Sequence, residues 1–160
     1  MPRNIDLFNE LVGLVFAQLY DRFPVASNID RKKIGEAIGL ELISSEINKK
    51  GQEQVKFVDP VEGLSFERLL LNTTRWLIHE GFIRSERNDA MVSVVLTSKA
   101  LTALNAMPAS LVPQEDERSF GDQLSGLARE TATEARRSAI TKIVGEVVGH
   151  FVRAATSSPA

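Results

Sequence analysis

The chain has no cysteine, only two histidines and no long run of apolar residues among its 160 positions. The absence of cysteine excludes disulfide bonds and thiolate metal sites. His79 and His150 have no neighbouring ligand at metal-binding spacing, so the sequence predicts no metal site built from protein side chains. No segment approaches the roughly 20 consecutive apolar residues that span a bilayer. We therefore expect no membrane-spanning helix.

Local catalytic motifs are also missing. Gly35 and Gly39 are not followed by the Lys-Ser/Thr pair of a phosphate-binding loop. No serine lies in the Gly-x-Ser-x-Gly pattern of a nucleophile elbow. We therefore expect a non-catalytic protein without a cofactor. An active site assembled from distant residues would leave no local trace, so that alternative stays open.

The composition is that of a globular protein, with 43% hydrophobic and 25% charged residues. Its length predicts one domain plus an appendage. The sequence begins without the pattern of a secretory signal, and we expect a cytoplasmic protein. The formal net charge of −2 argues against a dedicated nucleic-acid binder, although a local basic patch can outweigh the total.

The most informative segment is 64–107. Ser65 can cap a helix that continues to Gly81, a residue suited to the left-handed conformation that ends helices. At helical spacing, one face is apolar: Phe66, Leu70, Thr73 and Leu77. The opposite face carries a narrow polar stripe: Arg68, Asn72, Arg75 and His79. The sequence thus predicts an amphipathic helix that is buried around most of its circumference.

An extended pattern follows Gly81. Phe82 and Ile83 begin one predicted strand, a polar turn spans 85–89, and MVSVVL at 91–96 is typical of a second strand. Thr97 or Ser98 then caps a predicted helix that Pro108 ends. The apolar positions of that helix are Leu101, Leu104 and Met107.

The run WLIHEGFIR, with a hairpin and LTSKALTAL after it, resembles winged-helix proteins of the broad bacterial regulator type. The resemblance covers 76–104 well and 5–107 loosely. It implies a mainly α fold with a small β-hairpin wing (α+β), in a winged-helix domain at 1–107. Such domains bind nucleic acid or another protein.

The N-terminal half fits this pattern with one departure. Asp6 caps a predicted core helix that Pro24 ends. Asn28 or Asp30 caps a second helix, predicted to run to Ile43 with its isoleucines inward. Residues 42–63 form an insertion before the third helix. Within it, Lys49-Lys50-Gly51 is interpreted as a helix end and 55–58 as a short strand.

The C-terminal part is predicted as a linker at 108–118, a long helix at 119–155 and a disordered tail at 156–160. One apolar face of the helix is a candidate oligomer or partner interface: Ile140, Ile143, Val144, Val147, Val148, Phe151 and Val152. Packing against the same chain, against a second copy or against another protein are all open alternatives. Membrane contact is disfavoured because Glu146 dilutes the charge of Lys142 and Arg153.

The polar stripe is the candidate DNA-binding surface. In a major groove, arginine pairs with guanine and asparagine with adenine, which favours Arg68, Asn72 and Arg75 as base-reading residues. Arg84 and Arg87, near the wing, are candidate phosphate contacts, and Arg31, Lys32 and Lys33 could add others. The alternative is that the stripe is only the solvated side of a buried helix. Acidic neighbours would repel phosphate: Glu67, Glu80, Glu86 and Asp89.

Two hypotheses follow from these patterns. In the leading one, a homodimeric transcriptional regulator binds double-stranded DNA with the third helix and the wing. In the rival one, the winged-helix domain is an adaptor that binds protein through its C-terminal amphipathic helix.

Overall fold

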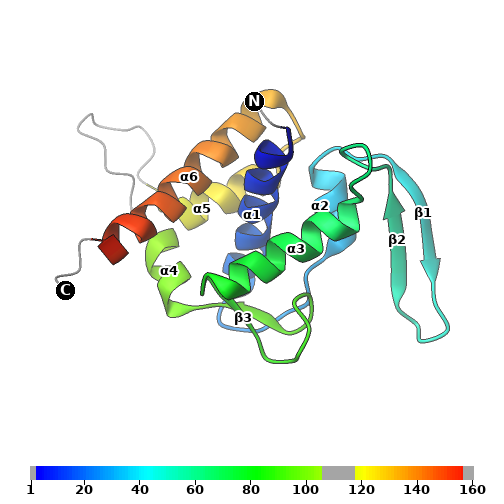
Figure 1. Ribbon diagram of the computed structural model, residues 1–160, viewed down its shortest axis with the longest axis horizontal. Helices are drawn as coiled ribbons and strands as arrows, with labels where there is room; N and C mark the ends of the chain where they lie inside the picture. The colour runs from blue at the N-terminus through cyan, green and yellow to red at the C-terminus, as the bar shows by residue number, and fades with distance from the viewer. Residues whose placement is uncertain (1–2, 106–117, 157–160) are drawn as a thin grey trace.

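A computed structural model describes residues 3–105 and 118–156 of the chain, with side-chain burial described up to residue 149. This part is mainly helical, with two small antiparallel sheets (Figure 1). The helices are α1 (Arg3–Arg22), α2 (Arg31–Ala37), α3 (Phe66–His79), α4 (Ser98–Asn105), α5 (Phe120–Ala128) and α6 (Glu134–Thr156). The strands are β1 (Leu42–Ile47), β2 (Glu53–Phe57), β3 (Ile83–Ser85) and β4 (Val94–Leu96).

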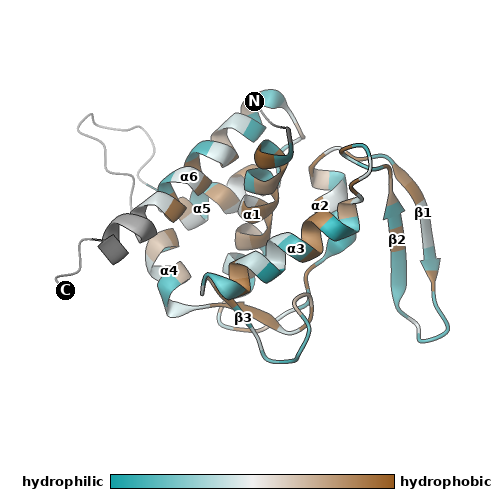
Figure 2. Cartoon of the chain, in the orientation of Figure 1, coloured by the Kyte–Doolittle hydropathy of each residue, from teal (hydrophilic) through white to brown (hydrophobic). Residues whose placement is uncertain are grey.

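The largely hydrophobic α1 is the centre of the core (Figure 2). Val12, Val15 and Phe16 are fully buried, and α5, α6 and α3 pack around the helix. This confirms the prediction of a central core helix. The helix begins at Arg3, however, so Asp6 lies in its first turn and is not the cap that was predicted. The C-terminal helices share one hydrophobic core with residues 3–105, because Leu124 and Ile140 belong to the same buried cluster as α1.

The prediction of one long helix over 119–155 is wrong. Ser119 caps α5, which ends at Ala128, and α6 begins only at Glu134. The hydroxyl of Thr133 accepts a hydrogen bond from the backbone N–H of Arg136, as a helix N-cap does. This local cap lets the chain reverse between α5 and α6, so that both helices reach α1.

The second helix is also shorter than predicted. Asp30 caps α2, but the helix ends at Ala37, and Gly39 takes a positive φ of 79°. Ile43 therefore lies in β1, where it is 57% exposed instead of inward-facing. Lys49-Lys50-Gly51 lies in the turn between β1 and β2, so the interpretation as a helix end is wrong as well. The predicted strand at 55–58 is confirmed in its main part by β2.

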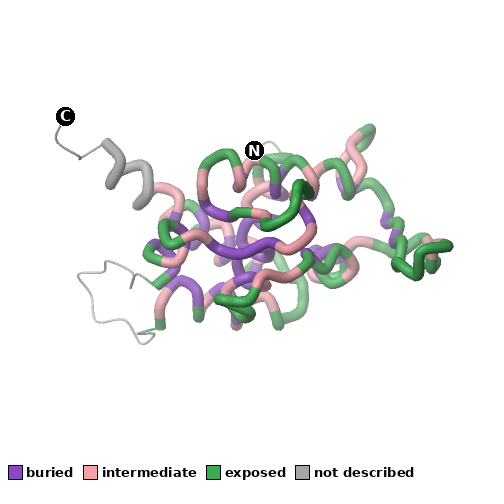
Figure 3. The backbone as a smooth tube through the Cα atoms, turned by 90° about the horizontal axis from the view of Figure 1, so that it is seen from below, coloured by how far each residue is buried: buried purple, intermediate pink, exposed green. Residues whose placement is uncertain are grey.

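The hairpin of β1 and β2 projects from the helical body (Figures 1 and 3), and most of its residues are exposed. Its base is anchored by Phe57, which is 4% exposed. The ring of Phe57 packs edge-on against Phe66 at the start of α3, with 5.2 Å between centroids. On its other side the ring lies against Gly35 of α2, where a Cβ atom would come within 2.4 Å. The hairpin is thus fixed to the body at one end.

The segment from Ser65 to Leu96 follows the prediction except in the second strand, which begins at Val94 because Met91 to Ser93 lie in turns and bends. The Ser65 side chain accepts a hydrogen bond from the backbone N–H of Arg68, and Gly81 has a φ of 81° after the end of α3. Strands β3 and β4 pair antiparallel. Ser27, before α2, exchanges two backbone hydrogen bonds of 2.9 and 2.8 Å with Val94 and so extends this sheet.

The predicted helix after the second strand is confirmed by α4, where Leu104 is buried and Leu101 half-buried. Met107 and Pro108 lie outside the described residues. So do the predicted linker, except Arg118, and the predicted tail from 157 onward.

Tyr20 joins the parts of the chain on either side of 106–117. Its hydroxyl lies 3.2 Å from the side-chain oxygen of Asn105 in α4. The same hydroxyl lies 3.4 Å from the Oγ of Ser119 and 3.3 Å from the carboxylate of Asp122. Its ring packs on Gly121, where a Cβ atom would come within 2.4 Å.

Within the described residues, no helix combines the length and hydropathy needed to cross a membrane.

Candidate nucleic-acid interface

The polar stripe of α3 faces solvent. Arg68, Asn72, Arg75 and His79 are all exposed, whereas Leu70 and Leu77 on the opposite side are fully buried. From Arg68 to His79 the stripe extends for about 16 Å at the helical rise of 1.5 Å per residue. The burial of the apolar side fixes the orientation of α3, so the stripe is presented on the outer surface of the molecule.

The residues of the polar stripe differ in whether their side chains already have a hydrogen-bond or ion-pair partner. The side-chain amide of Asn72 donates to the backbone carbonyl of Arg68 at 2.8 Å. Glu67 is engaged by Arg31 of α2, with 3.5 Å between the charged atoms. Within the part of the chain that the structure describes, neither Arg68 nor Arg75 forms an ion pair. Both guanidinium groups are therefore available to an anionic partner.

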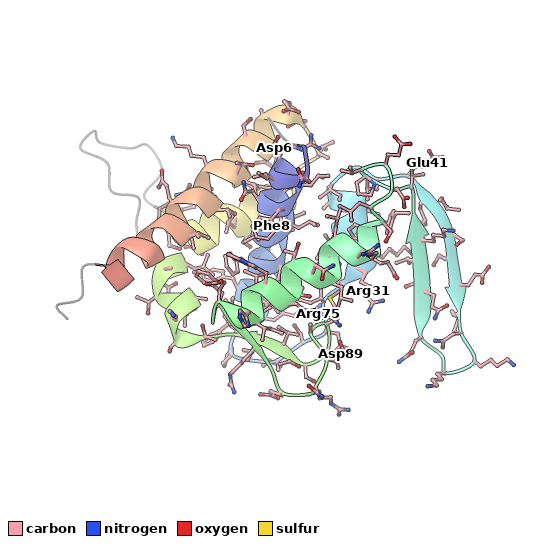
Figure 4. All side chains as sticks on the ribbon, in the orientation of Figure 1. Asp6, Phe8, Arg31, Glu41, Arg75 and Asp89 are labelled. Atoms are coloured by element: carbon pink, nitrogen blue, oxygen red, sulfur yellow. The ribbon has the colours of Figure 1, made fainter. Side chains whose placement is uncertain are left out.

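An open hollow of about 680 Å³ lies between α3 and the loop of the β3–β4 hairpin. Arg75 and Arg87 both line it, together with Arg31 of α2. Arg31, Arg75 and Asp89 surround the same part of the surface in Figure 4. A smaller hollow of about 170 Å³ beside it is lined by Arg31 and Arg68. The fold thus brings arginines from three elements to one concave surface.

Not all of the predicted DNA-binding residues join this surface. Arg84 is exposed on β3 and pairs with Val95 in the sheet register, but it lines neither hollow. Asn72 and His79 also lie outside both hollows. The concave surface therefore contains Arg68, Arg75 and Arg87 of the predicted set, and Arg31 is shared by both hollows.

Backbone contacts define the loop that carries Arg87. The hydroxyl of Ser85 lies within hydrogen-bond distance of the carbonyl oxygens of Arg87, Asp89 and Val92, and it accepts from the N–H of Arg87 at 3.1 Å. The carboxylate of Asp89 accepts from the N–H of Met91 at 2.9 Å. The side chain of Asp89 thus stabilises the turn by a local hydrogen bond to the backbone.

The β1–β2 hairpin borders a further hollow, which was not predicted from the sequence. A hollow of about 370 Å³ between this hairpin, α2 and the β3–β4 loop is lined by Lys32 and Glu53. The Glu53 carboxylate accepts from Ser45 at 2.5 Å and from Lys32 at 3.2 Å. These hydrogen bonds, with the positive charge of Lys32, lower the pKa of Glu53. Asn48 and Gly51, typical turn residues, were the available sequence signal for this hairpin.

The C-terminal face is largely covered by the chain itself. Ile140, Ile143, Val144 and Val147 are between 0 and 7% exposed, and α6 packs on α1. Val148 is half-buried, and the side chains of Phe151 and Val152 lie outside the described residues. Four residues predicted for an interface between chains are thus buried within the chain, because the break after α5 turns α6 back onto α1. An adaptor that used these four residues would first have to release them from the core.

Over residues 3–105 and 118–149, no group of three or more acidic or histidine side chains is arranged to hold a metal ion. No family model, curated protein or solved structure matches the chain.

Proposed function

We propose that residues 3–105 form a winged-helix domain that binds double-stranded DNA as a transcriptional regulator. The order of elements supports this proposal: α1, the extended segment at Ser27, α2, α3, and the β3–β4 hairpin as the wing. The β1–β2 hairpin is then an insertion between α2 and the recognition helix α3. The pairing of Ser27 with Val94 ties the segment before α2 to the wing.

In this function α3 enters the major groove. The groove is about 12 Å wide and about 8.5 Å deep and accepts one α-helix. Arg68, near the N-terminus of α3, would lie closest to the base edges, where its guanidinium can pair with guanine. Asn72 would give up its hydrogen bond to the Arg68 carbonyl in order to pair with adenine.

The wing would follow the phosphate backbone beside the groove. Arg87 in the wing loop and Arg75 on α3 line one hollow, so a phosphate between the two elements could meet both guanidinium groups. Arg84 would contact a neighbouring phosphate from the outer side of β3. The pairing of Glu67 with Arg31 offsets one of the acidic charges beside the stripe.

The observation that carries the proposal is the convergence of Arg75 and Arg87 on one open hollow, without an ion-pair partner for either among the described residues. The net charge of −2 argues against it, but the positive charges that face the phosphates can outweigh the total. Asp89 also lines this hollow, but its carboxylate accepts a hydrogen bond from the N–H of Met91. Guanidinium groups form strong bidentate hydrogen bonds with phosphate, so two of them beside one hollow favour phosphate binding.

The test is a fluorescence-anisotropy titration of a labelled random duplex with the full chain, from about 50 to about 200 mM salt. We expect binding that weakens steeply with salt, because each phosphate contact releases counterions. Arg75→Ala combined with Arg87→Ala should lower the affinity about tenfold or more and reduce the slope of log K against log salt by about two.

The matched control combines Arg22→Ala with Lys142→Ala, which removes the same charge from exposed positions on α1 and α6. This variant should bind as the unchanged chain does. No binding at low salt, or an equal loss in both double variants, would contradict the proposal.

A further inference from the structure

We propose that a hollow between α1, α2 and α5 binds a small molecule with a short aliphatic tail and a carboxylate head. This three-helix hollow, of about 80 Å³, is lined by one face of the C-terminal half of α1, by one face of α2 and by the end of α5. It shares no lining residue with the two arginine-lined hollows beside α3. The inference does not depend on DNA binding.

The three-helix hollow exists because α2 and α5 both pack on α1 without closing on each other. The main contacts of α2 are with α1, α3 and β2, whereas those of α5 are with α1, α4 and α6. Leu14 and Ala17 of α1 form the floor between them, with Ile34 of α2 and Ala128 of α5 at the sides. A concave site with an apolar lining and a few polar groups is the usual form of a small-molecule site.

The volume of the hollow limits the length of the tail. An apolar cavity of about 150 Å³ takes the six carbons of benzene, so a hollow of about 80 Å³ has room for roughly three. Leu14, Ala17 and Ile34 are only 3%, 2% and 1% exposed, so a tail on this floor would be removed from water. The polar head of such a ligand would remain at the mouth, among charged side chains.

The charged residues that line the hollow are three cations and two anions: Arg22, Lys33, Arg129, Asp21 and Asp30. Both anions already have partners. The carboxylate of Asp21 accepts from the hydroxyl of Ser125 at 2.5 Å and lies 3.5 Å from the guanidinium of Arg129. The carboxylate of Asp30 accepts from the backbone N–H of Lys33 at 3.0 Å. The lining therefore has an excess of one positive charge.

The two remaining cations determine the charge of the ligand. Arg22 at the end of α1 and Lys33 on α2 are exposed, and neither forms an ion pair within the described parts of the chain. A carboxylate at the mouth would supply the partner that both lack, and hydrogen bonds between charged groups are the stronger kind. An amine in the same place would meet two like charges. The hollow therefore favours an acid.

Hydrogen bonds hold the walls of the hollow in place. The side chain of Gln18 accepts from the backbone N–H of Asp30 at 3.1 Å and donates to the Asp30 carbonyl at 3.3 Å, which joins α1 to the start of α2. The hydrogen bond from Ser125 to Asp21 joins α5 to α1. Walls that are ordered before binding lose little free energy when a ligand enters. For so small a ligand with an exposed head, we expect a dissociation constant on the order of 1 mM.

Butyrate is the probe, because it joins a three-carbon tail to a carboxylate. Backbone amide chemical shifts of the full chain, recorded at constant ionic strength, should show saturable binding at Lys33, Ser125 and Ala128. Butyramide has the same shape without the charge and should bind about fivefold more weakly. Acetate keeps the charge but buries two fewer methylene groups, so it should bind about tenfold more weakly.

Two pairs of variants separate the head from the tail. Arg22→Gln combined with Lys33→Gln should lower the affinity for butyrate to that for butyramide and leave butyramide binding unchanged. Lys49→Gln combined with Lys142→Gln, at exposed positions outside the hollow, is the control and should bind both probes as the unchanged chain does.

Ala128→Leu fills the hollow and should abolish the binding of both probes. Ala26→Leu, at a half-buried position outside the hollow, should leave it intact. Three results overturn the proposal: no saturable shift at these amides up to about 50 mM butyrate, which is about fifty times the expected dissociation constant, equal affinities for butyrate and butyramide, or a butyrate affinity that the Arg22 and Lys33 double variant leaves unchanged. None of the three depends on the folding of Ala128→Leu.

Discussion

The carboxylate of Glu10 lies 3.0 Å from the guanidinium Nη2 of Arg136, and both side chains are 1% exposed. The second oxygen of Glu10 accepts from the Nε of Arg137 at 2.9 Å. Arg136 also donates to the carbonyl oxygens of Glu130, at 3.2 Å, and of Ala37. One buried ion pair thus joins α1 to the beginning of α6 and to the end of α2.

Glu10→Ala should destabilise the fold by about 3–5 kcal/mol, because it leaves the charge of Arg136 buried without its partner. Urea unfolding followed by circular dichroism measures this change. Glu134→Ala is the control: its carboxylate is 83% exposed and 3.6 Å from Arg137, so its removal should cost less than about 1 kcal/mol. Equal stability losses for the two variants would show that the buried pair has no special role.

Two helical glycines should respond oppositely to alanine. At Gly13 in α1, a Cβ atom would come within 2.4 Å of Ile140, whereas at Gly145 in α6 nothing lies within 4 Å. Gly13→Ala should destabilise by about 1–3 kcal/mol through overpacking. Gly145→Ala should stabilise by about 0.5–1 kcal/mol through helix propensity. Thermal unfolding distinguishes the two, and the same sign for both would contradict the packing of α6 on α1.

The anchor of the β1–β2 hairpin can be tested by a double-mutant cycle. Gly35→Ala should cost about 1–3 kcal/mol, because its Cβ atom would collide with the ring of Phe57. Phe57→Leu removes the ring and should cost stability as well. Combined, the two changes should cost less than their sum, since the smaller side chain leaves room for the alanine. Strict additivity in urea unfolding would mean that the two residues do not touch.

Glu53 should titrate below the ordinary glutamate pKa of 4.5, chiefly because Ser45 and then Lys32 hydrogen-bond its carboxylate. A lowered folded-state pKa means that the contribution of Glu53 to stability is present above about pH 4.5 and is lost as the pH falls through the folded value. Ser45→Ala should raise the pKa of Glu53 toward 4.5. Carboxyl chemical shifts across a pH titration measure it, and an unchanged midpoint in the variant would exclude the hydrogen bond as the cause.

The segment from α3 to β4 could be predicted from the sequence because its capping residues, apolar spacing and β-branched residues indicate the same elements. Ser65, the 3.6-residue apolar period and Gly81 define α3 at both ends, and the β-branched run at 91–96 indicates the strand that pairs with β3. The exposure of Arg68 and Arg75 follows from the same period. These features depend on residues close in sequence, so they can be predicted from one amino-acid sequence.

Long-range features could not be predicted in this way. The ion pair of Glu10 with Arg136 joins positions far apart in sequence, and neither residue differs locally from a solvated surface charge. The start of β1 was predicted as helix because Ile34, Ile38 and Ile43 are spaced four and five residues apart, close to the helical period. Gly39, with a positive φ of 79°, ends α2 before Ile43, and the contact of Phe57 with Gly35 holds the returning strand against the helix.

Tyr20 contacts residues on both sides of the segment 106–117. Its hydroxyl meets Asn105 before the segment 106–117 and Ser119 after it. The two ends of that segment are therefore held at one side chain, and their proximity does not depend on the peptide between them. A chain cleaved within 106–117 should yield two fragments that co-purify as one particle, and mixing separately produced fragments 1–110 and 114–160 should reconstitute the native circular dichroism spectrum.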